Sequence, residues 1–131
     1  MPDIATLVNH PDTTIAVVGA NDDPAEYGFR VYRDLKAKGL SVLAVNPNRT
    51  TVDGDPSYPS LQTLPLRPTL LNLVVPPEVT LQVLHRAHDL GINNVWLQPG
   101  AESPAVIEYL EAKGFSYLAG ACIMASSRAL V

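Results

Sequence analysis

Nucleophiles, bases and metal ligands are few in this 131-residue sequence, which has one cysteine, Cys122, and three histidines. His85 and His88 lie three residues apart and can share a helix face, but no third ligand accompanies them, and protein zinc sites use at least three protein ligands. His10 precedes a proline in an expected surface turn. We therefore predict no metal site and no catalytic residue, and look for a binding site instead.

The clearest chemical signal is an apolar run that ends at a glycine. Residues 14–18 read as a strand buried on both faces, Gly19 permits a sharp turn, and Pro24 suits the first turn of a helix. The free amides and positive end of a helix that follows such a strand attract phosphate groups. The predicted phosphate-binding residues are Gly19, Ala20, Asn21 and Asp22, with Tyr27 and Gly28 in the helix that follows.

This signal also fits a tight turn that binds nothing. The second and third glycines of the dinucleotide fingerprint G-x-G-x-x-G are absent from their usual spacing. Asp22 and Asp23 favour a helix N-terminus but repel a phosphate, unless they point away or hydrogen-bond a ribose.

Residues after the second expected strand, 41–45, indicate which nucleotide fits. The segment Asn46, Pro47, Asn48 and Arg49 has no carboxylate at the position where NAD sites place Asp or Glu for the ribose, which argues against NAD. Arg49 suits a bidentate contact to a phosphate on the adenosine, although a solvated loop charge is equally consistent.

A rigid apolar segment lies at the end of the third expected strand, 69–75. Val74, Val75, Pro76 and Pro77 can cover one face of an adenine. As a strand terminator, the Pro-Pro pair requires no ligand.

The order of expected elements gives the fold class. Strands at 14–18, 41–45, 69–75, 94–97 and 115–118 alternate with helices at 27–38, 78–90 and 104–113. Such alternation predicts right-handed crossovers and a parallel sheet covered on both faces. We expect an α/β, Rossmann-like three-layer fold with a five-stranded parallel sheet of order 3-2-1-4-5, in one domain over 1–131, with 1–12 as an N-terminal helical extension.

Composition narrows the possible partners. The chain is 47% hydrophobic with a net charge of −4 and has no basic cluster, so no nucleic-acid partner is expected. Its longest apolar runs, about six residues, are far below the roughly 20 that span a bilayer, and Met1-Pro2-Asp3-Ile4 does not resemble a signal segment. We expect a cytoplasmic protein without membrane partners. A protein partner or homodimer, paired through an exposed edge of strand 69–75 or 115–118, stays open.

Six motifs in order resemble the small stand-alone CoA-binding proteins, which are similar to the N-terminal CoA-binding domain of the succinyl-CoA synthetase alpha subunit. They cover most of the chain, from about residue 13 to 124: Gly19-Ala20-Asn21-Asp22-Asp23-Pro24, Val45-Asn46-Pro47-Asn48, Tyr58-Pro59-Ser60-Leu61, Val74-Val75-Pro76-Pro77, Trp96-Leu97-Gln98-Pro99-Gly100 and Cys122-Ile123-Met124.

The resemblance implies a location for each part of coenzyme A. The phosphates would lie near Gly19 to Asn21, the nucleotide end near Asn46 to Arg49 and adenine near Val74 to Pro77, with Gln98, Pro99 and Gly100 lining the pocket. Two departures stand out. Asn21 replaces a common serine, and Ala121 before Cys122, with Ala125-Ser126 after Met124, replaces a polar cluster of the family.

We therefore expect non-catalytic binding of coenzyme A or an acyl-CoA. The phosphohistidine chemistry of the synthetase that this chain resembles belongs to another domain. The alternative is an NAD(P)-binding oxidoreductase or redox-sensing domain, which rests on the fold alone. A disulfide between Cys122 and the thiol of CoA stays open, but no cationic sequence neighbour lowers the pKa of this cysteine.

Overall fold

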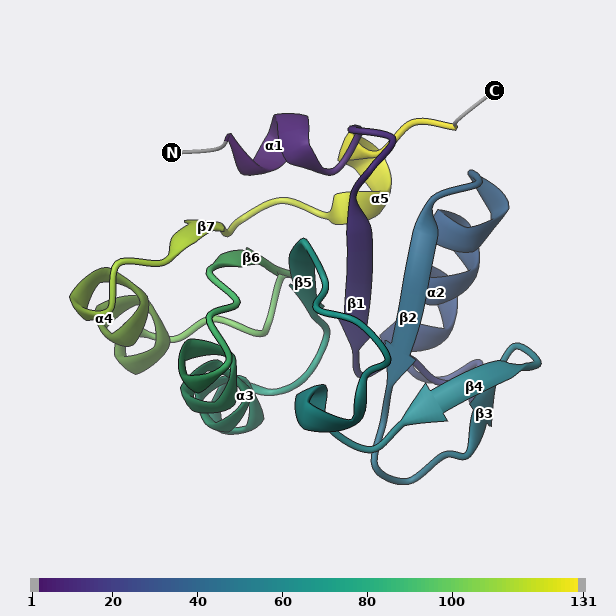
Figure 1. The fold of residues 1–131 in the computed structure, drawn as a ribbon, viewed down its shortest axis with the longest axis horizontal. Coiled ribbons are helices and arrows are strands. Elements are labelled where there is room, and N and C mark those ends of the chain that lie inside the picture. Colours follow the sequence, from purple (N-terminus) through teal and green to yellow (C-terminus); the bar gives the residue numbers. More distant parts are fainter. Residues whose placement is uncertain (1–2, 130–131) are drawn as a thin grey trace.

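The computed structural model describes residues 3–129, in which helices cover both faces of a mixed, mostly parallel seven-stranded sheet (Figure 1). The strand order is β3-β4-β2-β1-β5-β6-β7. The strands are β1 (Thr14–Val18), β2 (Ser41–Val45), β3 (Thr51–Val52), β4 (Asp55–Tyr58), β5 (Leu70–Leu73), β6 (Asn94–Leu97) and β7 (Ser116–Leu118). The helices are α1 (Ile4–Leu7), α2 (Tyr27–Ala37), η1 (Leu61–Thr63), α3 (Pro77–Asp89), α4 (Pro104–Ala112) and α5 (Ile123–Ser126).

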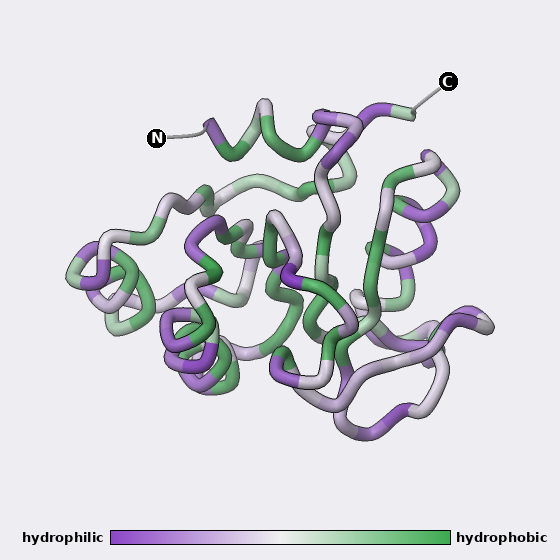
Figure 2. Tube along the Cα trace, in the orientation of Figure 1, coloured by the Kyte–Doolittle hydropathy of each residue, from purple (hydrophilic) through white to green (hydrophobic). Residues whose placement is uncertain are grey.

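The central strand β1 contributes to two hydrophobic cores, one on each face of the sheet. Ala16 and Val18 pack in the core that α3 and α4 cover, whereas Ile15 and Val17 pack in the core beneath α1, α2 and α5. Most of β1 is accordingly coloured as hydrophobic in Figure 2. Burial on both faces explains why the sequence of β1 is a continuous apolar run without alternation.

The predicted strand order was wrong. Of the five strands that the sequence analysis expected, residues 70–73 pair with β1 rather than with the outer side of β2, which gives the order β2-β1-β5-β6-β7 among those five. The edge of strand 69–75 that was suggested for dimer pairing is therefore occupied on both sides, by β1 and β6.

A strand that the sequence analysis missed occupies the outer position. β4 pairs in parallel with β2, and β3 pairs with β4 in an antiparallel hairpin, which makes the sheet mixed. The sequence of β4, Asp-Pro-Ser-Tyr, has no apolar run, because all four of its residues are at least partly exposed, and only the two-residue strand β3 lies between β4 and the edge of the sheet. Counted with β4, the order of the six parallel strands β4-β2-β1-β5-β6-β7 is 3-2-1-4-5-6.

The helix boundaries follow local sequence signals with one informative exception. At α4, the Ser103 side chain accepts a hydrogen bond from the Val106 amide, and Pro104 occupies the first helical position, as predicted. Helix α2 begins at Tyr27, so Pro24 lies in the preceding turns and not in the first helical turn. The connection between β1 and α2 is thus a longer loop than the sequence suggested.

The two ends of the described chain meet over one face of the sheet. The N-terminal helix α1 spans Ile4–Leu7, inside the expected extension over 1–12. Residues 1 and 2 of that extension lie outside the described part of the chain, and so do residues 130 and 131. The Asn9 side chain donates to the Ser126 carbonyl and accepts from the Arg128 amide. No helix among residues 3–129 is long and apolar enough to cross a membrane.

Candidate functional site

Two glycines bring the β1–α2 loop and helix α2 into direct contact. Gly19 has a φ of +101°, and a Cβ added there would meet the Val74 carbonyl oxygen and lie 2.9 Å from Cγ1 of Val75. A Cβ on Gly28 would collide with the Gly19 carbonyl oxygen. Gly28 therefore allows α2 to pack closely against the loop, which is the role of the third glycine in a dinucleotide fingerprint. It lies nine residues after Gly19, farther away than the third glycine of that fingerprint lies from the first.

This contact places unpaired amides beside the loop. The backbone N–H groups of Tyr27 and Gly28, the first two residues of α2, donate no hydrogen bond to any residue in the range 3–129. The N-cap residue Glu26 provides no side-chain cap either. Helix N-termini with free amides attract anions, and this one follows the central strand of a parallel sheet.

Asn46, directly after β2, ties the second predicted segment to the loop. Its side chain is 7% exposed; Nδ2 donates to the Ala20 carbonyl at 2.9 Å, and Oδ1 accepts from the Asn48 amide at 2.9 Å. The polar atoms of this side chain thus hold the backbone of both loops. Pro47, Asn48 and Arg49 follow it at the surface.

The third predicted segment continues β5 beside the same loop. The Val74 amide donates to the Val18 carbonyl, and the carbonyl of Val74 faces Gly19. Val74 and Val75 are half-buried, Pro76 is exposed, and Pro77 opens α3. The ends of β1, β2 and β5 therefore converge, as the sequence analysis expected for the carboxyl edge of a parallel sheet.

Asp22 points toward a cation on α2 and a turn of the hairpin. Its Oδ1 accepts from Arg33 Nη2 at 2.8 Å and from the Asp53 amide at 2.8 Å. The hydrogen bond from the Asp53 amide, then the one from Arg33, lowers the pKa of Asp22, and the positive charge of Arg49 adds to this effect. Asp23 caps the turn that follows, because its side chain accepts from the Ala25 amide.

Gln98, after β6, has its side chain in a buried polar group on the α2 and α5 face. It is 1% exposed; Oε1 accepts from the Ile123 amide at 2.8 Å and from Asn72 Nδ2 at 3.2 Å. The Ile123 N–H can only donate, so it fixes the orientation of the Gln98 amide and leaves Nε2 facing Cys122 Sγ at 3.3 Å. Pro99 and Gly100 are exposed, and Gly100 has a φ of +98°.

Two side chains form hydrogen bonds with the Cys122 sulfur. Gln98 Nε2 donates to it at 3.3 Å, and Tyr27 Oη lies 3.1 Å from it in a pair in which either group can donate. Burial raises the pKa of the Cys122 thiol, but the hydrogen bonds from Tyr27, Gln98 and the amides of Met124 and Ala125 outweigh burial and lower it. No cationic residue next to Cys122 in the sequence lowers the pKa of its thiol. In the fold, the neutral side chains of Tyr27 and Gln98, which are distant in sequence, help to lower it.

Other concave surfaces lie elsewhere. A hollow of ≈ 330 Å³ borders α1 and β7, and another of ≈ 360 Å³ lies between α2 and the β2–β4 edge; neither is lined by a residue of the 19–28 loop. Among residues 3–129, no group of three or more His, Cys, Asp or Glu side chains is placed to hold a metal ion.

Comparisons with known proteins show what this chain is similar to. A family model described as a CoA binding domain matches residues 13–128. A curated relative, the alpha subunit of an ADP-forming acetate–CoA ligase of Pyrococcus furiosus, is 34% identical over 82 residues, which are 62% of this chain and 18% of that protein. The chain thus spans less than a fifth of the length of this curated relative.

Solved structures include proteins of similar size. A conserved hypothetical protein from Pyrococcus furiosus is 43% identical, with a TM-score of 0.83 over 86% of this chain and 97% of that one. A dinucleotide-forming acetyl-coenzyme A synthetase of Ca. Korarchaeum cryptofilum, in complex with phosphate and ADP, is 25% identical, with a TM-score of 0.73 over 90% of this chain and 27% of that one.

Proposed function

Because this chain belongs to the CoA-binding domain family, we propose that it binds coenzyme A or an acyl-CoA and catalyses no reaction by itself. The observation that carries the proposal is the contact of Gly28 with Gly19, which leaves the Tyr27 and Gly28 amides free beside the loop. Such amides suit the diphosphate of a nucleotide. The Gly19–Asp22 backbone forms the other side of this phosphate site.

The nucleotide end of the ligand fits the surface beyond Asn46. Arg49 is exposed, and its positive charge is near enough to lower the pKa of Asp22. We assign it to the phosphate on the adenosine ribose, with Pro47 and Asn48 beside it. Val74, Val75, Pro76 and Pro77 provide an apolar contact for adenine.

The other end of the ligand is directed toward β6. Gln98, Pro99 and Gly100 line this side of the proposed pocket, where Gln98 supports Cys122. The thiol and acyl end of CoA would reach this group.

A binding role is supported by what the site contains. The chain corresponds to a small part of an enzyme subunit, and the described residues place no His near the loop. Acyl transfer or ligation would require groups from a partner protein. A homodimer or another chain is a possible partner.

The proposal is tested by native mass spectrometry of the purified protein, followed by calorimetric titration with CoA, acetyl-CoA, NADH and NADPH. We expect binding of CoA or acetyl-CoA and weaker binding when Arg49 is replaced by Ala. The Arg86→Ala variant, which loses the same charge from the exposed face of α3, is the matched control. Binding of NADH or NADPH with no heat from CoA would instead support the alternative, an oxidoreductase or redox-sensing domain.

A further inference from the structure

A charged network joins the proposed phosphate loop to the β3–β4 hairpin through one side chain of α2. Arg33 Nη1 donates to the Asn21 carbonyl at 3.2 Å, and Nη2 donates to Asp22 Oδ1 at 2.8 Å. Its Nε lies 3.4 Å from Asp53 Oδ1. The guanidinium also lies over the Phe29 ring, 3.9 Å from its centroid, which fixes its plane.

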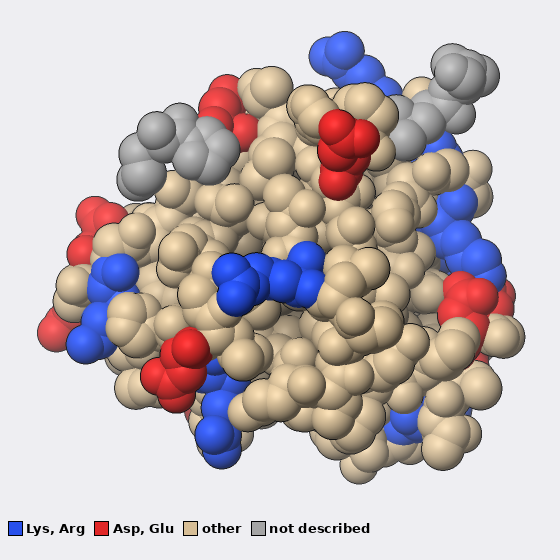
Figure 3. Space-filling model, in the orientation of Figure 1, with Lys and Arg blue, Asp and Glu red and all other residues tan. Residues whose placement is uncertain are grey.

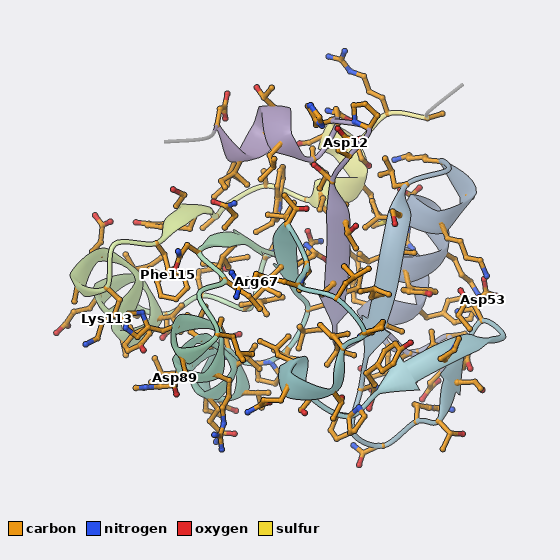
Figure 4. The ribbon with its side chains drawn as sticks, in the orientation of Figure 1. Asp12, Asp53, Arg67, Asp89, Lys113 and Phe115 are labelled. Carbon is orange, nitrogen blue, oxygen red and sulfur yellow. The ribbon has the colours of Figure 1, made fainter. Side chains whose placement is uncertain are left out.

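The hairpin is held by the same network from its other side. The Asp53 amide donates to Asp22, and Lys36 Nζ contacts both Asp53 Oδ2 at 3.1 Å and Asp55 Oδ2 at 2.9 Å. Asp53 has a φ of +51°, so its backbone conformation in the turn is one that L residues rarely adopt. Figure 4 shows Asp53 at the tip of the hairpin, beside α2, and Figure 3 shows basic and acidic side chains next to one another along this edge.

The position of Asp22 creates an electrostatic problem that this network resolves. A carboxylate in the loop that faces a diphosphate would repel it. Here Asp22 is turned to Arg33 and to the Asp53 amide, and its negative charge is offset by a guanidinium that is itself partly shielded from water. Hydrogen bonds between charged groups, such as the one from Arg33 to Asp22, are stronger than those between neutral groups.

We propose that Arg33 is a positioning residue for CoA binding: it neutralises Asp22 and holds the loop at 21–22 and the hairpin turn at 53 together, without contacting the ligand. This inference rests on the proposed function. It assigns a role in phosphate affinity to a side chain in the second turn of α2, although the free amides lie at the start of that helix.

The test measures CoA affinity in four forms of the chain: wild type, Arg33→Met, Asp22→Asn and the double variant. We expect Arg33→Met to weaken CoA binding by about fivefold or more, because it leaves an unpaired carboxylate near the diphosphate. The double variant should recover most of this loss relative to Arg33→Met, because it also removes the unpaired carboxylate. The deficit of Arg33→Met should shrink in 0.5 M salt, since ions screen exposed charges beyond about 4–5 Å.

A merely structural role gives a different pattern. If Arg33 only stabilises the fold, then Asp22→Asn does not rescue the Arg33→Met variant, and the deficit does not depend on salt. Either result overturns the inference. Arg86→Met is the matched control for loss of one positive charge, and circular dichroism with a thermal melt checks that each variant is folded.

Three further outcomes separate the inference from the proposed function. If wild type binds CoA and Arg33→Met binds it equally well, this inference is wrong and the proposed function stands. If Asp22→Asn weakens binding as much as Arg33→Met does, Asp22 contacts the ligand directly and the inference is wrong. If wild type fails to bind CoA or acetyl-CoA, the proposed function fails, and the inference fails with it.

Discussion

Gly28 of α2 lies against the backbone of Gly19 so closely that a β-carbon at position 28 would collide with the Gly19 carbonyl oxygen. An alanine in a helix is normally more stable than a glycine by about 0.8–1 kcal/mol. At this position the sign reverses, because the collision pushes α2 away from the loop.

We therefore predict that Gly28→Ala lowers the free energy of unfolding by about 1–3 kcal/mol and weakens CoA binding. Urea unfolding and calorimetric titration measure the two effects. Gly114→Ala is the control, since the space around Gly114 is open, although its φ of +73° adds some strain. If Gly28→Ala is as stable as wild type or more stable, then α2 is not in close contact with the Gly19 backbone in solution.

Asn46 gives a second prediction, on how the two loops are joined. Its buried Nδ2 donates to the Ala20 carbonyl, so Asn46→Ala leaves that carbonyl without its partner and should cost about 1–3 kcal/mol of stability. Asn46→Asp should cost at least as much, because a carboxylate oxygen would replace the donor next to a carbonyl oxygen. This variant also tests the alternative cofactor: it supplies the carboxylate of NAD sites, and yet we expect no gain in NADH affinity. A gain would show that the side chain at position 46 is free to reach a ribose.

The buried hydroxyl of Tyr32 predicts a loss of stability at alkaline pH. Burial first, then the hydrogen bond to Asp55 Oδ2 at 2.8 Å and the nearby carboxylates, raises the pKa of Tyr32 above that of an ordinary tyrosine. Above pH ~10, Tyr32 of the unfolded chain loses its proton while the folded chain keeps it, so the unfolded state binds fewer protons and stability falls as pH rises.

Urea unfolding between pH 8 and 11 checks this prediction. Tyr32→Phe should cost about 1 kcal/mol at pH 8, where the hydrogen bond is lost, and should show a smaller fall above pH 10. Tyr117→Phe, on β7 and away from this network, is the control. If the free energy of unfolding falls equally steeply with pH in Tyr32→Phe and in wild type above pH 10, then Tyr32 does not cause the alkaline loss of stability.

The environment of Cys122 predicts a reactive thiol. Hydrogen bonds from Tyr27 and Gln98 and from backbone amides outweigh burial and lower the pKa of the thiol. The rate of alkylation by iodoacetamide should therefore reach half its maximum at a lower pH than for a model thiol such as glutathione. Tyr27→Phe removes one donor to the sulfur and should move that midpoint to higher pH, whereas Tyr117→Phe should not. A midpoint that does not move would mean that the tyrosine hydroxyl does not act on the thiolate.

Local sequence signals specified most of the elements. The bounds of β1, β2 and β6 match the expected strands, and Ser103 with Pro104 marked the start of α4, because apolar runs and caps depend on neighbours in the chain. The same signals identified the loop at Gly19. The resemblance to CoA-binding proteins, carried by short motifs, is confirmed by the family match over residues 13–128.

Tertiary structure decided what those signals do not encode. The polar strand β4 forms through its pairing with β2 and β3 and not through an apolar pattern, so the strand order could not be obtained from periodicity. The partner of Asp22 is eleven residues away along the chain, and the thiol of Cys122 is 95 residues from the hydroxyl that contacts it. Sequence alone thus indicated which segments would contribute to the proposed site, since each is a local turn or strand end. Only the packed fold determined where their charges and donors point, because those directions depend on contacts between distant residues.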